Sequence, residues 1–424
     1  TNQARALFEN SFTEAFAQDA IIPMDLTQPQ LRIRKGVAST DSPSAALSGT
    51  VSPGGITWGA PGAGAPGWSG GTITSTNLSG APDANATGLD AGALVRFAIV
   101  VENTGRGLGG AFDVALSDAM PGGFVIPSGG INLRVADGTG AAMSSASGGY
   151  FTAGAGTPSS GQTGTITLDD PGPTGSPGGS IDPVDPTSGR NLAVITYELE
   201  VAATAEANTS YTNTASITNF AASEGGPDYT PVTPAADLTN TASARVAPVT
   251  VTKSVLSTDH AESVTPNVVV GEAVTYTVTL RIPEGRTGNA QLVDTLPSGM
   301  AVVSVDSITA SGGVSTSVGG GFPTVLSNAQ SSLASPGQTI TIPLGDITNA
   351  NRDDATPEYV TVTLTAVVLN VAGNQNATSL VNSASLTSSG HSSAVVGSTP
   401  VTVREPVLQV TKTAAPNPTD AGNT

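Results

Sequence analysis

A lysine, an aspartate and an asparagine recur in the same order at two places in this chain of 424 residues. One set is Lys35, Asp118 and Asn213, and the other is Lys253, Asp294 and Asn382. In a buried setting an amine tends to lose its proton, whereas a carboxyl group tends to keep its own. A neutral lysine can then attack an asparagine amide and release ammonia, while the protonated carboxyl polarises the amide. Both sets are therefore candidates for an internal lysine–asparagine cross-link, an isopeptide bond.

The alternative is a lysine–aspartate ion pair, with the asparagine hydrogen-bonded to a bulge or turn. Asn240 also competes with Asn213, because both precede a Thr-Ala-Ser run. The covalent interpretation requires the first and last strands of a domain to be neighbours, as is common in β-sandwiches. A cross-link closing a loop of well over about 100 residues would stabilise the fold by roughly 4–5 kcal/mol.

The segments that carry these residues are predicted to be strands. Each lysine ends an alternating segment, at 30–35 and 249–253, and a third such segment lies at 407–412. A pair of longer segments, 92–105 and 271–282, follows the lysines, and the second alternates apolar residues with threonine over eight positions. A period of two predicts a half-buried strand. The aspartates precede Met-Pro and Leu-Pro turns at 117–123 and 293–299, and the asparagines lie in the matching segments 211–218 and 380–387.

Because the order of these elements is the same in both copies, the chain is interpreted as a tandem repeat. One domain is predicted at 29–248, with long Gly-rich insertions at 40–91 and 137–190, and the next at 249–404. Residues 1–28 are interpreted as the tail strands of a preceding repeat, and 405–424 as the first strand of a following one. A helix is the alternative for the N-terminal segment, because Phe8, Phe12, Ala15 and Phe16 would share one helical face; the repeat match favours strands.

Composition supports an all-β fold. The chain has 51 Gly and 30 Pro, and only 11% of its residues are charged. Valine and threonine favour strands, and glycine and proline separate them. The net charge of −18 opposes binding to nucleic acid. The absence of cysteine excludes disulfides and thiolate metal sites, and no apolar run is long enough to span a membrane.

The four shared elements resemble the prokaryotic surface repeat catalogued as "domain of unknown function eleven". Its pattern has a Val-Thr-Lys opening, a Gly-Glu-x-Val-Thr-Tyr-Thr strand, an Asp-Thr-Leu-Pro turn and a late Asn-Thr-Ala strand. The matching positions here are Lys253, 271–277, 294–297 and 382–384. The first domain departs from the pattern, with Phe97 in place of the tyrosine. The resemblance implies tandem immunoglobulin-like β-sandwiches on a cell surface, and isopeptide-forming pilin and adhesin domains use the same residue types.

Other chemistry has little support in the sequence. The two histidines, His260 and His391, lie in polar stretches, and no nucleophile elbow, phosphate loop or zinc-protease motif occurs. An ordinary enzyme is therefore not expected. Calcium is the one cofactor considered, because acidic residues cluster in loops at Asp169, Asp170, Asp182, Asp185, Asp346, Asp353 and Asp354. None of these clusters has EF-hand spacing, and solvated loop acids are the favoured alternative.

The predicted function is architectural: an extracellular structural subunit of a cell-surface filament, stalk or coat, whose partners are copies of itself. The alternative is an adhesin, in which the same rod presents a glycan or another surface ligand with a binding loop. Its contact residues would be Trp58 and Trp68, which lie in the first insertion. Large aromatic side chains are costly to leave in water, so both are expected to contact a ligand or another subunit.

Overall fold

The structure is a computed structural model of the whole chain. It describes residues 2–9, 15–22, 27–107, 109–145, 148–149, 152–153, 159–169, 180–260, 263–333, 337–352, 356–389, 391–406 and 408–413. Strands dominate, and the chain divides into two compact units. The first unit is Thr1–Pro248 with Pro283–Arg286 and Arg352–Ala355, and the second is Val249–Ile282, Thr287–Asn351 and Thr356–Thr424. Within the described ranges, no helix has the length and apolarity needed to cross a membrane.

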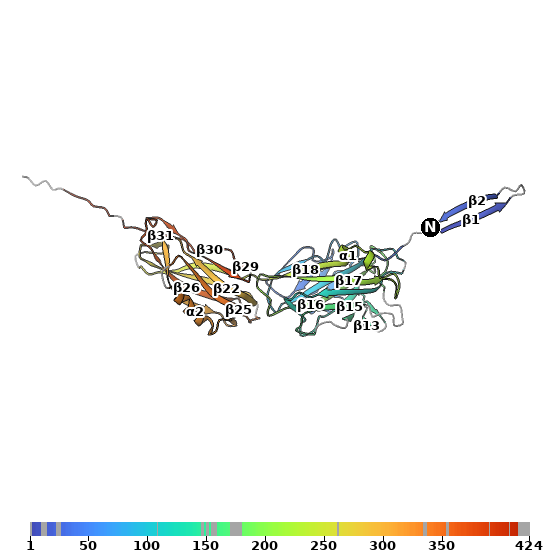
Figure 1. Cartoon of the computed structure of the whole chain (residues 1–424), viewed down its shortest axis with the longest axis horizontal. Helices are drawn as coiled ribbons and strands as arrows, with labels where there is room; N and C mark the ends of the chain where they lie inside the picture. The colour runs from blue at the N-terminus through green and yellow to red at the C-terminus, as the bar shows by residue number, and fades with distance from the viewer. Residues whose placement is uncertain are drawn as a thin grey trace, which may run out of the picture. The chain divides into compact units, whose positions relative to one another are not determined.

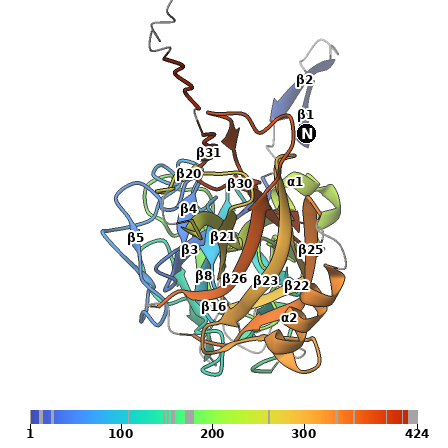
Figure 2. The ribbon, with the colours of Figure 1, turned by 90° about the vertical axis from the view of Figure 1, so that its left-hand side faces the viewer.

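The second unit is a sandwich of two sheets. One sheet has the order β19-β21-β26-β23, and the other has the order β24-β25-β22-β28-β29. Their bounds are β19 Thr250–Thr258, β21 Ala273–Ile282, β22 Gly285–Thr295, β23 Met300–Ala310, β24 Val314–Thr316, β25 Thr339–Asn349, β26 Glu358–Val368, β28 Ser383–Ser388 and β29 His391–Ser392. If the main strands are lettered A to G in chain order, the strands of the first sheet follow one another as A-B-E-D, and the second sheet contains C-F-G. This is the immunoglobulin arrangement. Figure 2 shows β21, β26 and β23 side by side.

Smaller elements complete this unit. Helix α2, Gly321–Ser332, packs on β23 and β25 (Figure 2). Its buried residues are Phe322, Val325 and Ala329. The remaining short strands are β20 Asn267–Val268, β27 Ser379–Leu380, β30 Val396–Gly397 and β31 Val401–Val403. β31 pairs with both β20 and β27, and β30 pairs with β28.

The first unit repeats the same plan. One sheet has the order β10-β16-β8-β3, with β11 also on β16, and the other has the order β14-β15-β9-β17-β18-β7-β4. Figure 1 labels β15, β16, β17 and β18 of these strands. Their bounds are β3 Leu31–Thr40, β4 Ala46–Ser48, β7 Asn85–Leu89, β8 Leu94–Asn103, β9 Phe112–Ala119, β10 Phe124–Val125, β11 Arg134–Asp137, β14 Thr152–Ala153, β15 Thr165–Asp169, β16 Leu192–Val201, β17 Ser210–Ala221 and β18 Thr239–Val246. The short elements are β5 Thr57–Trp58, β6 Trp68–Ser69, β12 Ser144–Ser145, β13 Gly148–Gly149, η1 Thr230–Val232 and α1 Ala235–Leu238. The expected fold class, tandem immunoglobulin-like sandwiches with insertions, is confirmed.

The two units differ in how their A-B-E-D sheet is covered. In β21, buried and half-buried residues alternate strictly, so only one face of the sheet lies in the core. In β8, by contrast, every residue after Leu94 is buried. The outer face of that sheet packs against a second hydrophobic cluster that includes Ile56, Ile73 and Leu78 of the first insertion. The insertion is therefore a folded cover with its own core.

The segments at the two ends of the chain have different outcomes. β1 Asn2–Glu9 and β2 Ala15–Ile22 pair with each other as an antiparallel hairpin, so the N-terminal segment forms strands rather than the alternative helix. The structure assigns no strand within 408–413, where a strand was expected at 407–412. A strand is defined by pairing, and pairing of this segment within a following repeat stays a prediction. Residue 407 and residues 414–424 lie outside the described residues.

Candidate functional site

In the first unit, Lys35 lies between the two sheets. It is on β3 and is fully buried, and its Nζ forms an ion pair with Asp118 of β9 in the opposite sheet. The same Nζ donates a hydrogen bond to the Tyr197 hydroxyl on β16, at 2.7 Å. That hydroxyl donates to Oδ2 of Asp118 at 2.5 Å and accepts from Nδ2 of Asn213 at 2.9 Å. The structure thus brings together all three residues of the first predicted set.

The second unit holds the corresponding group. Lys253 of β19 forms an ion pair with Asp294 of β22, and both side chains are buried. Asn382, which directly precedes β28, is fully buried too. Its amide lies near enough to Asp294 to favour the charged carboxylate, but outside hydrogen-bonding geometry.

Strand register places the two groups identically. Asp118 is opposite Ala215, and Asn213 lies two residues before Ala215. Asp294 is opposite Ala384, and Asn382 lies two residues before it. Diagonal neighbours of this kind share one face of a sheet and lie within side-chain reach. Each lysine comes from the facing sheet, so the same three-strand geometry recurs in both units.

Each site contains an acceptor that lacks a donor. Oδ1 of Asp118 and Oδ1 of Asn213 are buried with no hydrogen-bond partner in the described part of the chain. Oδ1 of Asp294 and both amide atoms of Asn382 are likewise unpartnered within the described ranges. Leaving a buried polar atom without a partner costs roughly 1–3 kcal/mol. A proton on the aspartate would make one of its oxygens a donor, and an asparagine oxygen that accepted it would be polarised as the cross-linking reaction requires.

Burial shifts the protonation equilibria in the direction that cross-linking needs. Burial lowers the pKa of Lys35 from 10.5 to about 8, although Asp118 opposes the shift. Burial also lowers the pKa of Lys253, again against the effect of its aspartate. Burial raises the pKa of Asp294 above its usual value, and Lys253 only partly offsets this. A depressed amine pKa beside a raised carboxyl pKa favours a neutral nucleophile and a neutral acid.

An aromatic ring completes each site. Lys35 Nζ lies 5.3 Å from the ring centroids of both Phe97 and Tyr197, and Lys253 Nζ lies 5.1 Å from that of Tyr276. Phe97 and Tyr276 are equivalent in register. The hydroxyl that Phe97 lacks is supplied in the first unit by Tyr197, the residue directly opposite Phe97 on β16. Sequence reasoning missed Tyr197, because its role depends on the pairing of two distant strands, which the structure shows and the sequence does not.

Asn240, the competitor of Asn213, has a different role. Its Oδ1 accepts a hydrogen bond from the backbone N–H of Lys35 at 3.1 Å. It therefore holds the backbone of β3, whereas Asn213 contacts the side-chain cluster. The structure separates these two asparagines, which have the same sequence context.

The expectation that Trp58 and Trp68 form an exposed contact surface is wrong. They are only 6% and 7% exposed and pack edge to face, with ring centroids 6.0 Å apart. Their indole N–H groups donate to Val51 O at 2.8 Å and Gly71 O at 3.2 Å. Both rings belong to the hydrophobic cluster that covers the outer face of β8 and β16. A large aromatic is indeed costly in water, but here the chain itself buries it.

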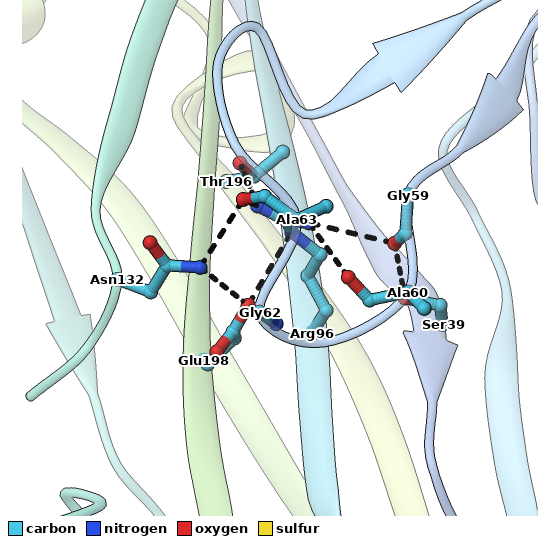
Figure 3. A network of polar contacts seen from close by, with 9 residues as sticks. All are labelled: Ser39, Gly59, Ala60, Gly62, Ala63, Arg96, Asn132, Thr196 and Glu198. Atoms are coloured by element: carbon cyan, nitrogen blue, oxygen red, sulfur yellow. Dashed lines mark hydrogen bonds and ion pairs between the residues drawn. The ribbon is translucent and has the colours of Figure 1, made fainter. Parts of the chain in front are cut away.

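A buried arginine fixes the same insertion to the sheet (Figure 3). Arg96 of β8 donates to the carbonyl oxygens of Ala60 and Ala63 at 3.0 and 3.2 Å. Glu198 of β16 accepts hydrogen bonds from Gly62 N and Asn132 Nδ2, both at 2.8 Å. The charged pair is thus used to satisfy loop backbone groups, which identifies this network as structural.

Among the residues that the structure describes, no group of three or more potential metal ligands converges, and calcium binding stays a prediction. Asp185 accepts from Thr187 N, Thr187 Oγ1 and Ser188 N, which lowers its pKa to about 2 and marks a local turn. Asp182 lies in the same loop, and Asp346 accepts from Asn289 N. Asp170, Asp353 and Asp354 lie outside the described residues, as does the side chain of Asp169.

The chain is thus an all-β protein of tandem immunoglobulin-like sandwiches, each with a buried lysine–aspartate–asparagine site. No protein-family model matches it, and no curated protein matches it. Among solved structures, the C-terminal domain of the antigen I/II polypeptide BspA of Streptococcus agalactiae is 10% identical with a TM-score of 0.27, over 75% of this chain and 95% of that one. The major pilin SpaD of Corynebacterium diphtheriae is 10% identical with a TM-score of 0.25, over 88% of this chain and 66% of that one. The major pilin BcpA of Bacillus cereus is 9% identical with a TM-score of 0.23, over 69% of this chain and 64% of that one. Such values transfer no function, so function is argued from the site.

Proposed function

We propose that this chain is a structural segment of an extracellular cell-surface filament, stalk or coat, in which a lysine–asparagine isopeptide bond locks each sandwich. One observation carries the proposal: the same reactive set recurs at the same register positions in both units and is buried in both. A site that no substrate can enter acts on its own chain. Chemistry directed at the chain itself serves durability rather than turnover.

The reaction balances without any other reactant. The neutral amine of the lysine attacks Cγ of the asparagine, forming a carbon–nitrogen bond. The bond from Cγ to Nδ2 then breaks, and Nδ2 leaves as ammonia after gaining the proton that Nζ loses. The aspartic acid hydrogen-bonds to Oδ1 throughout and is recovered unchanged. Nothing is oxidised or reduced, and each bond lowers the mass by about 17 Da, that of one ammonia.

The positions of the bonds suit a protein under tension. In the second unit, Lys253 is on the first core strand and Asn382 directly precedes β28, a late one. A force applied at the two ends of the unit would therefore be carried by the cross-link, and most of the sandwich lies between the two linked residues. The chain has no cysteine, so disulfides are not available for this purpose. On the chain-entropy account each bond would also stabilise its unit by roughly 4–5 kcal/mol.

Single-molecule pulling of the full chain tests the mechanical role. If it is not cross-linked, the Lys253–Asn382 segment of about 130 residues unfolds under force and adds about 450 Å of contour length, at about 3.5 Å per residue. The Lys35–Asn213 segment would likewise add about 600 Å. The wild-type chain should release neither length. Asn382→Ala should release the first and Asn213→Ala the second. Asn240→Ala, the matched control, should behave as wild type. A wild-type chain that releases both lengths would contradict the mechanical role.

Copies of the same chain are the proposed partners. Electron microscopy of purified cell-surface material, labelled with an antibody to the second unit, tests the assembly. Label repeating along filaments or across a sheet-like coat supports the proposal. Label only on isolated, unassembled molecules would count against it. The adhesin alternative has lost its proposed contact residues, because Trp58 and Trp68 are buried.

A further inference from the structure

The two sites are not chemically equal, and the difference is what the tyrosine hydroxyl of each site contacts. The Tyr197 oxygen accepts from Lys35 Nζ and Asn213 Nδ2 and donates to Asp118 Oδ2. A phenol has one donor and two acceptor positions, so this oxygen is fully used. The nitrogen that would attack and the nitrogen that would leave therefore contact the same atom, and they lie within about two hydrogen-bond lengths of each other.

The same hydroxyl fixes the orientation of the asparagine amide. Because Nδ2 of Asn213 is held by Tyr197, its Oδ1 is left as the amide atom without a partner, as is Oδ1 of Asp118. Oδ1 is the atom that must be polarised. The tyrosine thus presents the amide in the rotamer that the reaction requires.

The second unit lacks this contact. The residue opposite Tyr276 on β26 is Leu364, which occupies the position that Tyr197 has in the first unit. The Tyr276 hydroxyl instead points to Met300 Sδ at 3.4 Å. Neither amide atom of Asn382 is hydrogen-bonded within the described residues, so no tyrosine there holds its amide as Tyr197 holds that of Asn213.

We propose that Tyr197 is a catalytic residue of the first unit, carrying the proton from Lys35 Nζ to the departing Nδ2 of Asn213 and orienting the amide. The inference rests on the proposed cross-linking. As Nζ bonds to Cγ, Nδ2 becomes a basic amine nitrogen, and the Tyr197 hydroxyl turns from Asp118 to donate its proton to Nδ2. The Tyr197 oxygen takes a proton from Nζ in exchange. The tyrosine ends as it began, and ammonia leaves. The first unit then links faster than the second, which has no such relay.

The test follows both bonds in one chain. Full-length protein is made by cell-free synthesis, quenched in acid at intervals and digested, and the linked peptides of each unit are quantified by mass spectrometry. Wild type should link the first unit at least about ten-fold faster than the second, since general acid–base relays typically contribute about 100-fold or more. Tyr197→Phe should slow the first unit by a similar factor and leave the second unchanged. Tyr359→Phe, the control at an exposed tyrosine outside both sites, should change the rate in neither unit.

The outcomes separate the two proposals. If neither unit of the wild-type chain links, the proposed function fails. If both link and Tyr197→Phe links its first unit as fast as wild type, including complete linkage at the first time point, only the role of Tyr197 is overturned. The comparison between the units within the wild-type chain needs no substitution. A first unit that is no faster than the second would overturn the inference even if Tyr197→Phe failed to fold.

Discussion

At the scale of single residues, the buried lysines decide the chemistry. An ammonium group held in an apolar core loses its hydration, and the single aspartate beside it compensates only in part. Lys35 consequently has a pKa of about 8, within reach of ordinary solution conditions. The cross-linking step needs the neutral amine, so this value predicts how the reaction depends on pH.

Linking of the first unit should proceed below pH 8 and slow above it. The reactive form has a neutral amine and a protonated aspartic acid, which together hold one proton, the same number as the ion pair. Raising the pH through about 8, the pKa of Lys35, removes that proton and leaves the carboxylate. The rate should therefore be nearly constant between about 6 and about 7.5 and fall nearly ten-fold for each pH unit well above 8. Timed mass spectrometry of freshly synthesised chain across this range measures the rate. A rate that keeps rising above pH 8 would show that the reaction does not need the proton of the aspartic acid.

The residues of the site were predictable to different degrees. The lysine, aspartate and asparagine could be aligned because each is followed or preceded by a shared strand or turn pattern. Tyr197 could not be placed, because its role depends on lying opposite Phe97, a pairing between segments far apart in the chain. Strand pairing of this kind is set by tertiary structure, and one sequence carries no direct record of it.

At the scale of elements, β8 and β21 show how one strand position serves two environments. β21 alternates apolar residues with threonine and has one half-buried face. Within β8, residues 95–101 are apolar on both faces, apart from Arg96. A continuous apolar run indicates burial on both sides. That run was the available signal that the first insertion covers the sheet, and so that Trp58 and Trp68 belong to a core.

Removing either indole should destabilise the first unit alone. Trp58→Ala deletes a buried ring and its hydrogen bond to Val51 O, and core changes of this kind typically cost about 3–5 kcal/mol. Tyr359→Ala serves as the control, because Tyr359 is 37% exposed on the second unit and should change stability by less than about 1 kcal/mol. Denaturant titration monitored by hydrogen exchange measures the unfolding transition of each unit separately. An unshifted first-unit transition in Trp58→Ala would contradict the assignment of the insertion as a core.

At the scale of the whole molecule, the two units share one immunoglobulin-like topology despite the large insertions of the first. The tandem arrangement was visible in the sequence because the order of four strand and turn patterns repeats. The content of the insertions was not visible, since Gly-rich segments carry little periodicity. β15, within the segment interpreted as the second insertion, pairs with β9 and is part of the sandwich itself.

The intact mass of the purified full-length chain tests the central claim most directly. We predict a mass lower than that calculated from the sequence by about 34 Da, the equivalent of two ammonia molecules, with the Lys35–Asn213 and Lys253–Asn382 peptides joined after digestion. Asn382→Ala should reduce the deficit to about 17 Da, and adding Asn213→Ala should abolish it. A wild-type chain with the full calculated mass, folded and aged near pH 7, would contradict the account.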